Sequence, residues 1–267
     1  MAVAASGERT VSDPAAPLLA CRDLDLRYGA RMLVRGLQWN VRRGERWAVV
    51  GPNGAGKSSL LRVLAGAQRP AAGTVALAGL PAERTTADAL AAIRAFVADR
   101  WADPFGFTAR DTVLAGRFRL RGGDPDAGAA ALRFLEQVAC AHLADRDVRG
   151  LSRGERQRVA LAAALAQETP LLFLDEPVSH QDPRQRGSVL RCLTAAAQGD
   201  AARTIIAVFH DLDAALRFAT HALLLSGDGA WHAGAAQDVL TAENLAQLFG
   251  VRFIEACAEG RRIVVAE

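Results

Sequence analysis

The 267-residue sequence predicts an α/β protein with a mostly parallel sheet, flanking helices and an antiparallel β layer near the N-terminus. Three short apolar segments, at residues 46–50, 171–174 and 205–209, each precede a stretch that favours a helix. This alternation is typical of parallel strands covered by helices on both faces. Residues 18–41 instead alternate apolar and polar side chains around a turn. That pattern predicts a half-buried antiparallel layer.

The domain organisation predicted from the sequence is a loose tail over residues 1–16 and a single domain over 17–267. The tail is rich in Ala, Ser, Gly and Pro and lacks the apolar stretch of a secretory signal. Within the domain, residues from about 86 to 165 favour helices, with turn-rich breaks at 103–106 and 121–125. We predict that they form a helical subdomain inserted into the α/β core. The last forty or so residues predict a short strand, a helix and a terminal strand.

Composition excludes several classes of protein. The net charge of +3, from 32 basic and 29 acidic residues, is too nearly balanced to favour nucleic-acid binding. No apolar run approaches the roughly 20 residues that a membrane-spanning helix needs, so we expect a soluble protein. The four cysteines are widely separated in the sequence. A disulfide framework or a Cys-based metal site is therefore not expected.

The segment after the first apolar strand fits the phosphate-loop pattern G-x-x-x-x-G-K-[ST] in full and leads into a helix. It reads Gly51-Pro52-Asn53-Gly54-Ala55-Gly56-Lys57-Ser58. Glycines let backbone N–H groups turn toward phosphates, the lysine reaches the β- and γ-phosphates, and the serine hydroxyl coordinates Mg²⁺. The sequence therefore predicts a phosphate-loop (P-loop) NTPase core that binds a nucleotide with Mg²⁺.

Two consecutive acids, Asp175 and Glu176, end the second apolar strand. Adjacent side chains at a strand end point in different directions, so one carboxylate can serve Mg²⁺ while the other faces the attacking water. The alternative is that one of them caps the next helix. That alternative explains one acid but not both.

The stretch Leu151-Ser152-Arg153-Gly154-Glu155-Arg156-Gln157-Arg158 resembles the L-S-G-G-Q signature of ATP-binding-cassette (ABC) ATPases, about two dozen residues before Asp175. From about residue 18 to the C-terminus the chain resembles that family. A Ser and a Gly before a helix are otherwise a simple N-cap. The resemblance implies instead a helix N-terminus that completes the ATP site of a second, opposed copy.

The resemblance also implies roles for single residues. Tyr28 stands at the position of the aromatic that stacks on adenine, and is otherwise a core-edge residue. His210 stands at the position of the switch histidine, and is otherwise structural. The implied catalytic residues are Glu176, His210 and Lys57. The implied nucleotide-binding residues are Tyr28, Gly51, Pro52, Asn53, Gly54, Ala55, Gly56, Lys57, Ser58, Ser59, Ser152, Gly154, Glu155 and Asp182. The implied metal-binding residues are Ser58, Asp175 and Asp99.

Two positions depart from the family pattern. Arg153 replaces the first signature glycine and adds a long cation. Asp99 stands where the family has a glutamine that senses Mg²⁺ and touches the membrane subunits. An aspartate can still ligate Mg²⁺, although it adds negative charge and shortens the reach. The alternative is a helix cap with no sensor at this position.

The function that the resemblance implies is an ATP-hydrolysing transporter subunit at the cytoplasmic face of the cell membrane. Its implied partners are a second copy of itself in a head-to-tail dimer, separate membrane permease subunits and an extracytoplasmic substrate-binding protein, with no nucleic acid. Residues 105–117 and 239–251 resemble ATPases that import iron–siderophore complexes, haem or cobalamin. The alternatives are an ABC ATPase acting on ribosomes or DNA, an exporter subunit, and a binding module without ATPase activity.

Overall fold

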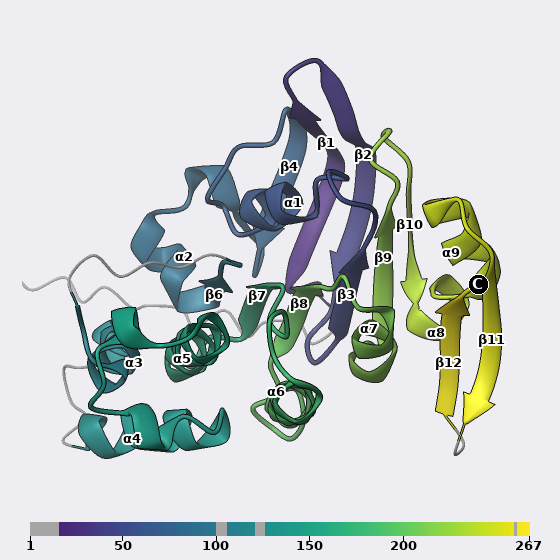
Figure 1. Ribbon diagram of the computed structural model, residues 1–267. Helices are drawn as coiled ribbons and strands as arrows, with labels where there is room; N and C mark the ends of the chain where they lie inside the picture. The colour runs from purple at the N-terminus through teal and green to yellow at the C-terminus, as the bar shows by residue number, and fades with distance from the viewer. Residues whose placement is uncertain (1–15, 100–105, 121–125, 259–260) are drawn as a thin grey trace, which may run out of the picture.

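The computed structural model of the protein describes residues 16–99, 106–120, 126–258 and 261–267. The expected tail at 1–16, except for its last residue, lies outside these ranges. The turn-rich breaks expected at 103–106 and 121–125 also lie outside them, except for Gly106. The fold class that the sequence predicts is confirmed, as the sheets and helices below show (Figure 1).

The antiparallel layer is a four-stranded sheet in the order β2-β1-β4-β5. It consists of β1 (Leu19–Tyr28), β2 (Arg31–Val41), β4 (Ala72–Leu77) and β5 (Leu80–Pro81). Residues 18–41 form its first hairpin, as the alternating pattern predicts. Strand β4 pairs with β1 across the phosphate loop and its helix, and the sequence analysis did not predict this pairing.

The central sheet has six strands in the order β10-β9-β3-β8-β7-β6. Its strands are β3 (Arg46–Val50), β6 (Arg94–Val97), β7 (Leu171–Asp175), β8 (Thr204–Val208), β9 (His221–Leu225) and β10 (Trp231–Ala235). All neighbours pair in parallel except β10, which runs antiparallel to β9. The three apolar segments singled out in the sequence are β3, β7 and β8, side by side at its centre.

Two hydrophobic cores lie on the two faces of this sheet, and the strands supply both by alternation. On β7, Leu172 and Leu174 join the core beneath the helices. Leu171 and Phe173 join the core shared with the antiparallel layer and α1. All four side chains are fully buried, and each such burial is worth roughly 1.5–3 kcal/mol. A continuous apolar run is therefore required in this strand.

The helices and the remaining strands complete the fold. They are α1 (Lys57–Leu64), α2 (Ala87–Ile93), α3 (Ala109–Gly116), α4 (Ala127–Gln137), α5 (Arg153–Ala166), α6 (Pro183–Ala196), α7 (Leu212–Phe218), α8 (Ala236–Val239), α9 (Ala242–Phe249), β11 (Phe253–Ala258) and β12 (Arg261–Ala266). Helices α3, α4 and α5 gather at one end of the molecule, away from the β11–β12 hairpin (Figure 1). The bounds 86–165 of a helical subdomain stay a prediction.

The C-terminal region differs from the expected strand, helix and strand. It contains β10, two short helices and an antiparallel hairpin of β11 and β12. Phe253 packs against the helical core and Val264 is buried in it, so this hairpin is fixed by tertiary contacts that a short segment does not reveal. Across the described residues, none of the helices combines the length and apolar character that bilayer crossing requires.

Candidate functional site

The phosphate loop runs from the end of β3 to the first residue of α1. Gly54 and Gly56 have φ values of +78° and +94°, in the left-handed region that favours glycine. At Gly51 the constraint is space, because an added Cβ would overlap the carbonyl oxygen of Leu225 on β9. The loop therefore has glycines where the turn and the close approach of β9 require them.

Lys57 opens α1 and lies almost fully buried beside this loop. Its Nζ donates hydrogen bonds to the carbonyl oxygens of Gly51, at 2.7 Å, and Pro52, at 2.9 Å. Burial lowers the pKa of Lys57, while the negative charges of Glu176 and Asp175 act in the opposite direction. The ammonium is thus held over the loop, where phosphate oxygens can replace the two carbonyls.

An open cavity of about 430 Å³ lies over the loop. Its lining comprises Tyr28, Arg31, Leu33, Asn53, Gly54, Gly56, Lys57, Ser58, Ser59 and His210. Tyr28 is 79% exposed at the end of β1, as suits stacking on a planar base. Arg31 is not part of any motif in the sequence, and its Nε and Nη2 donate to the carbonyl oxygen of Gly227, at 3.1 and 2.8 Å. No sequence motif predicts that contact between β2 and the β9–β10 turn.

Ser58 and Asp175 meet on the metal side of the loop. The Ser58 hydroxyl donates to Asp175 Oδ1 at 3.0 Å. Asp175 is 2% exposed, and burial, followed by the charges of Glu176 and Asp99, raises its pKa, while the Ser58 hydrogen bond opposes the rise. These two hard oxygen ligands fit Mg²⁺, which keeps several of its waters. Within the described ranges, three or more His, Cys, Asp or Glu side chains are nowhere grouped so that they could hold a metal ion.

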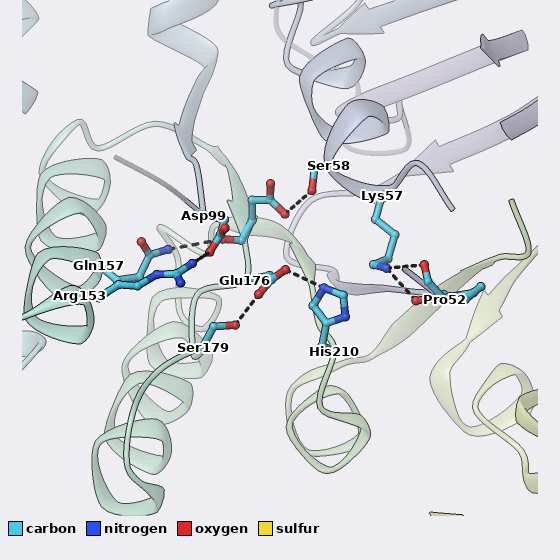
Figure 2. Close-up of polar contacts among 11 residues, drawn as sticks. Pro52, Lys57, Ser58, Asp99, Arg153, Gln157, Glu176, Ser179 and His210 are labelled. Carbon is cyan, nitrogen blue, oxygen red and sulfur yellow. Dashed lines mark hydrogen bonds and ion pairs between the residues drawn. The ribbon is translucent and has the colours of Figure 1, made fainter. Parts of the chain in front are cut away.

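Glu176 has different partners from Asp175, as the strand-end pattern predicts, because Asp175 contacts Ser58 while Glu176 contacts His210 and Ser179 (Figure 2). Its Oε1 lies 2.6 Å from His210 Nε2, and its Oε2 accepts a hydrogen bond of 2.7 Å from the Ser179 hydroxyl. Its φ of +55° is unusual for a residue with a Cβ and costs on the order of 1 kcal/mol. The fold thus holds this carboxylate by both oxygens in a strained conformation, beside the phosphate loop.

Helix α5 begins with a capping box formed by Ser152 and Glu155. Ser152 Oγ accepts a bond from the Glu155 backbone N–H, and the Ser152 backbone N–H donates to Glu155 Oε2 at 2.8 Å. The Ser152 hydroxyl also donates to Glu155 Oε2 at 2.7 Å, and this bond, followed by the one from the Ser152 backbone N–H, lowers the pKa of Glu155. Gly154 lies against the loop that follows β7, because an added Cβ would be 2.9 Å from the carbonyl oxygen of His180. Ser152 itself is exposed at this helix end.

A further candidate, Asp182, also acts as a helix cap. Asp182 caps α6 by accepting from the Gln185 backbone N–H at 2.8 Å. For Glu155 and Asp182 the structure therefore shows a capping contact, and a contact with nucleotide stays a prediction. Asp99 Oδ1 accepts a bond of 2.7 Å from Arg153 Nη2, so a metal-binding role for Asp99 also stays a prediction (Figure 2).

Comparison with known proteins places this site in a family context. The family model for the ABC transporter matches residues 34–179. The hemin import ATP-binding protein HmuV of Streptomyces coelicolor is 42% identical, over 80% of this chain and 78% of the relative. The cobalamin import ATP-binding protein BtuD of Halobacterium salinarum is 38% identical over 86% of this chain, which spans 58% of the length of that relative.

A solved structure gives the same result. It is a chain described as belonging to a metal-chelate type ABC transporter in an inward-facing conformation, and it superposes with a TM-score of 0.79 at 28% identity. The likeness covers 94% of this chain and 97% of the solved one.

Proposed function

The chain belongs to the ABC transporter ATPase family, and we propose that it hydrolyses ATP to power import through separate membrane permease subunits. The proposed cargo is an iron complex, haem or cobalamin. The observation that carries this proposal is the 42% identity to a hemin import ATP-binding protein over most of both chains. Similarity to a cobalamin import protein and to a metal-chelate type transporter supports the same branch.

The proposed ATP site combines an adenine side, at Tyr28, with the phosphate loop and a metal side, at Ser58 and Asp175. Tyr28 stacks on adenine, residues 51–59 surround the phosphates, and Lys57 gives up its two carbonyl contacts to hold the β- and γ-phosphates. Ser58 and Asp175 hold Mg²⁺, which neutralises phosphate charge when it is bound. Burial raises the pKa of Asp175, so its ionised form is disfavoured when no cation is near. A bound Mg²⁺ would offset this effect, because a nearby cation favours the ionised carboxylate, and this supports the proposed role.

Glu176 is the proposed general base. A water between its carboxylate and the γ-phosphate can be oriented by Glu176 and lose a proton to it. His210, 2.6 Å from Glu176 in the nucleotide-free chain, contacts the γ-phosphate when ATP is present. The short distance between His210 Nε2 and Glu176 Oε1 supports a shared position for the two residues beside the reacting phosphate.

We propose that two copies bind ATP head to tail. In each site one copy supplies the phosphate loop, and the other supplies Ser152, Gly154 and Asp182. The exposed positions of Ser152 and Asp182, at the N-termini of α5 and α6, support this arrangement. Hydrolysis then separates the copies and moves the permease.

The remaining partners follow from the importer proposal. They are permease subunits at the cytoplasmic face of the membrane and an extracytoplasmic substrate-binding protein. The test is reconstitution of the chain with the permease encoded beside its gene in lipid vesicles, with ATP on the side of the ATPase. We expect ATP-dependent uptake of one of the three cargo classes, and none with the Glu176→Gln variant. ATP hydrolysis that no neighbouring permease alters, with no uptake, would contradict the proposal.

A further inference from the structure

The two residues that depart from the family pattern contact each other. Arg153 Nη2 donates to Asp99 Oδ1 at 2.7 Å, although the two residues are 54 positions apart in the sequence. Asp99 follows the end of β6, and Arg153 is the first residue of α5. The side chains are 41% exposed for Arg153 and 28% for Asp99. A charge-assisted contact thus joins the central sheet to the start of the signature helix.

A second contact on the same face of α5, made by Gln157, is weaker than the Asp99–Arg153 ion pair. Gln157 lies one turn after Arg153, on the same side of the helix. Its Nε2 approaches the carbonyl oxygens of Ala98, at 3.5 Å, and Asp175, at 3.4 Å. These distances are at the long end for hydrogen bonds. The Asp99–Arg153 ion pair is therefore the stronger of these attachments between α5 and the ends of β6 and β7 (Figure 2).

The first turn of α5 is also confined on a different side. Gly154 packs so closely on the carbonyl of His180 that a Cβ would be 2.9 Å from that oxygen. The loop around His180 and the segment at Asp99 therefore hold this turn between them. Ser152, immediately before the turn, is the exposed residue whose position they determine.

The charges at the two positions also compensate each other. A carboxylate near the N-terminus of α5 interacts favourably with the helix dipole, and Arg153 adds a full positive charge there. The negative charge of Asp99 lies 2.7 Å from the positive charge of Arg153, so each charge offsets the other at this helix end.

We propose that Asp99 and Arg153 form a positioning pair that fixes the first turn of α5, and with it Ser152, relative to the phosphate loop of the same chain. The proposal rests on the proposed function, in which Ser152 completes the nucleotide site of a second copy. Arg153 is compatible with that site because Asp99 is present, and Asp99 is compatible with it because Arg153 is present. Neither residue needs to touch nucleotide or metal for this role.

The test is a double-mutant cycle in a Glu176→Gln background, which slows hydrolysis. Four proteins are compared: the background itself, the same chain with Asp99→Asn, with Arg153→Gln, and with both. The measurement is the ATP concentration at half-maximal dimer formation, by analytical ultracentrifugation. We expect each single change to raise that concentration by about 3- to 10-fold. The double change should raise it no more than about twofold beyond the larger single effect.

Two controls separate positioning from general loss of charge. Arg110 and Asp145 form an ion pair of 3.0 Å in the helical region, in which the arginine is as exposed as Arg153 and the aspartate is more exposed than Asp99. The Arg110→Gln and Asp145→Asn double variant should stay within about twofold of the background. Raising NaCl from about 0.05 to 0.5 M should shrink the difference between the background and the Asp99→Asn, Arg153→Gln double variant, because salt screens exposed pairs.

Hydrogen exchange in the absence of nucleotide provides a readout that does not depend on dimer formation. Amides of residues 153–157 should exchange faster in either single variant, and no faster still in the double variant. The proposal would be overturned if the two single-variant effects on dimer formation multiplied in the double variant. It would also be overturned if amide exchange were unchanged in both single variants. A background protein that stays monomeric at every ATP concentration would instead refute the proposed dimer, while exchange would still test the pair.

Discussion

The phosphate-loop side and the α5 side of the site are built in different ways. Beside the phosphate loop Lys57 and Asp175 are buried, and burial raises the pKa of Asp175. At the start of α5 the titratable groups are more exposed, and local hydrogen bonds lower the pKa of Glu155. The first side retains every motif residue that the sequence analysis looked for. The second side has Arg153 and pairs it with Asp99.

This difference shows where substitution is tolerated. A buried carboxylate has few alternatives once its partner is fixed, because an unpaired charge in that position is costly. Half-exposed ion pairs contribute little to stability, so their members can be exchanged if the geometry is kept. The two sides can therefore follow the family pattern to different degrees while making one site.

The largest expected effect tests whether the phosphate-loop side carries the chemistry. Replacing Glu176 by Gln removes the proposed base and should lower the ATPase rate by roughly 10²- to 10⁴-fold. ATP binding is retained, so the variant should elute as an ATP-dependent dimer from a sizing column. Glu243→Gln, on the exposed face of α9, is the matched control and should leave the rate within about twofold. A Glu176→Gln protein that stays monomeric with ATP would contradict the two-copy site.

The next effect concerns the tight packing of the loop against β9. Gly51→Ala places a methyl group on the carbonyl oxygen of Leu225 and should lower the free energy of unfolding by about 1–3 kcal/mol. Gly128→Ala provides the comparison, because Gly128 lies in α4 with no atom within 4 Å of an added Cβ. That change should stabilise the protein by up to about 1 kcal/mol. Urea unfolding of both variants measures the contrast, and equal effects would show that Gly51 is not packed as described.

The phosphate loop, the apolar strands and the paired acids could be predicted because each is specified by a short segment. Glu176 and Asp175 have separate partners, His210 and Ser58, because they are adjacent at a strand end. The pairing of β4 with β1 could not be predicted in this way, because its partners are separated by the whole phosphate loop and α1.

The side-chain partners across the site also could not be predicted from the sequence. The sequence shows Asp99 and Arg153 as two isolated departures, and only the packing of α5 beside β6 brings them to 2.7 Å. The bond from the Ser179 hydroxyl to Glu176 is likewise a contact that no sequence pattern predicts. The S-x-x-E spacing of Ser152 and Glu155 was the one available signal for the capping box.

Opposite pH dependences should distinguish the two sides in nucleotide-free, Mg²⁺-free buffer. The folded-state pKa of Asp175 lies above its usual value of 3.8, so the folded chain binds that proton more tightly. Stability relative to Asp175→Asn should therefore fall as pH rises from about 4, by at most about 1.4 kcal/mol per pH unit. The folded-state pKa of Glu155 lies below 4.5, so its contribution is present above that pH and is lost on acidification.

Urea unfolding between about pH 3.5 and 6 measures both differences. Wild type compared with Glu155→Gln should gain stability as pH rises toward about 4.5 and then level off, whereas wild type compared with Asp175→Asn should lose stability as pH rises from about 4. The Glu155 effect should be the smaller, because that side chain is more exposed to solvent. Two slopes of the same sign would show that the two carboxyl groups do not differ in the way their surroundings indicate.

The smallest effect separates the capping role of Ser152 from its role toward a second copy. Ser152→Ala removes the acceptor for the Glu155 backbone N–H and should cost about 1 kcal/mol of unfolding free energy. Thr241→Ala removes the equivalent cap of α9, whose hydroxyl accepts from Asn244 N–H at 3.1 Å, and should cost a similar amount. If the α5 terminus meets the nucleotide of a second copy, Ser152→Ala alone should also weaken ATP-dependent dimer formation, and Ser152→Thr should largely restore it. Equal dimer formation in the two alanine variants would limit Ser152 to capping and would leave the α5 side without a nucleotide contact from its hydroxyl.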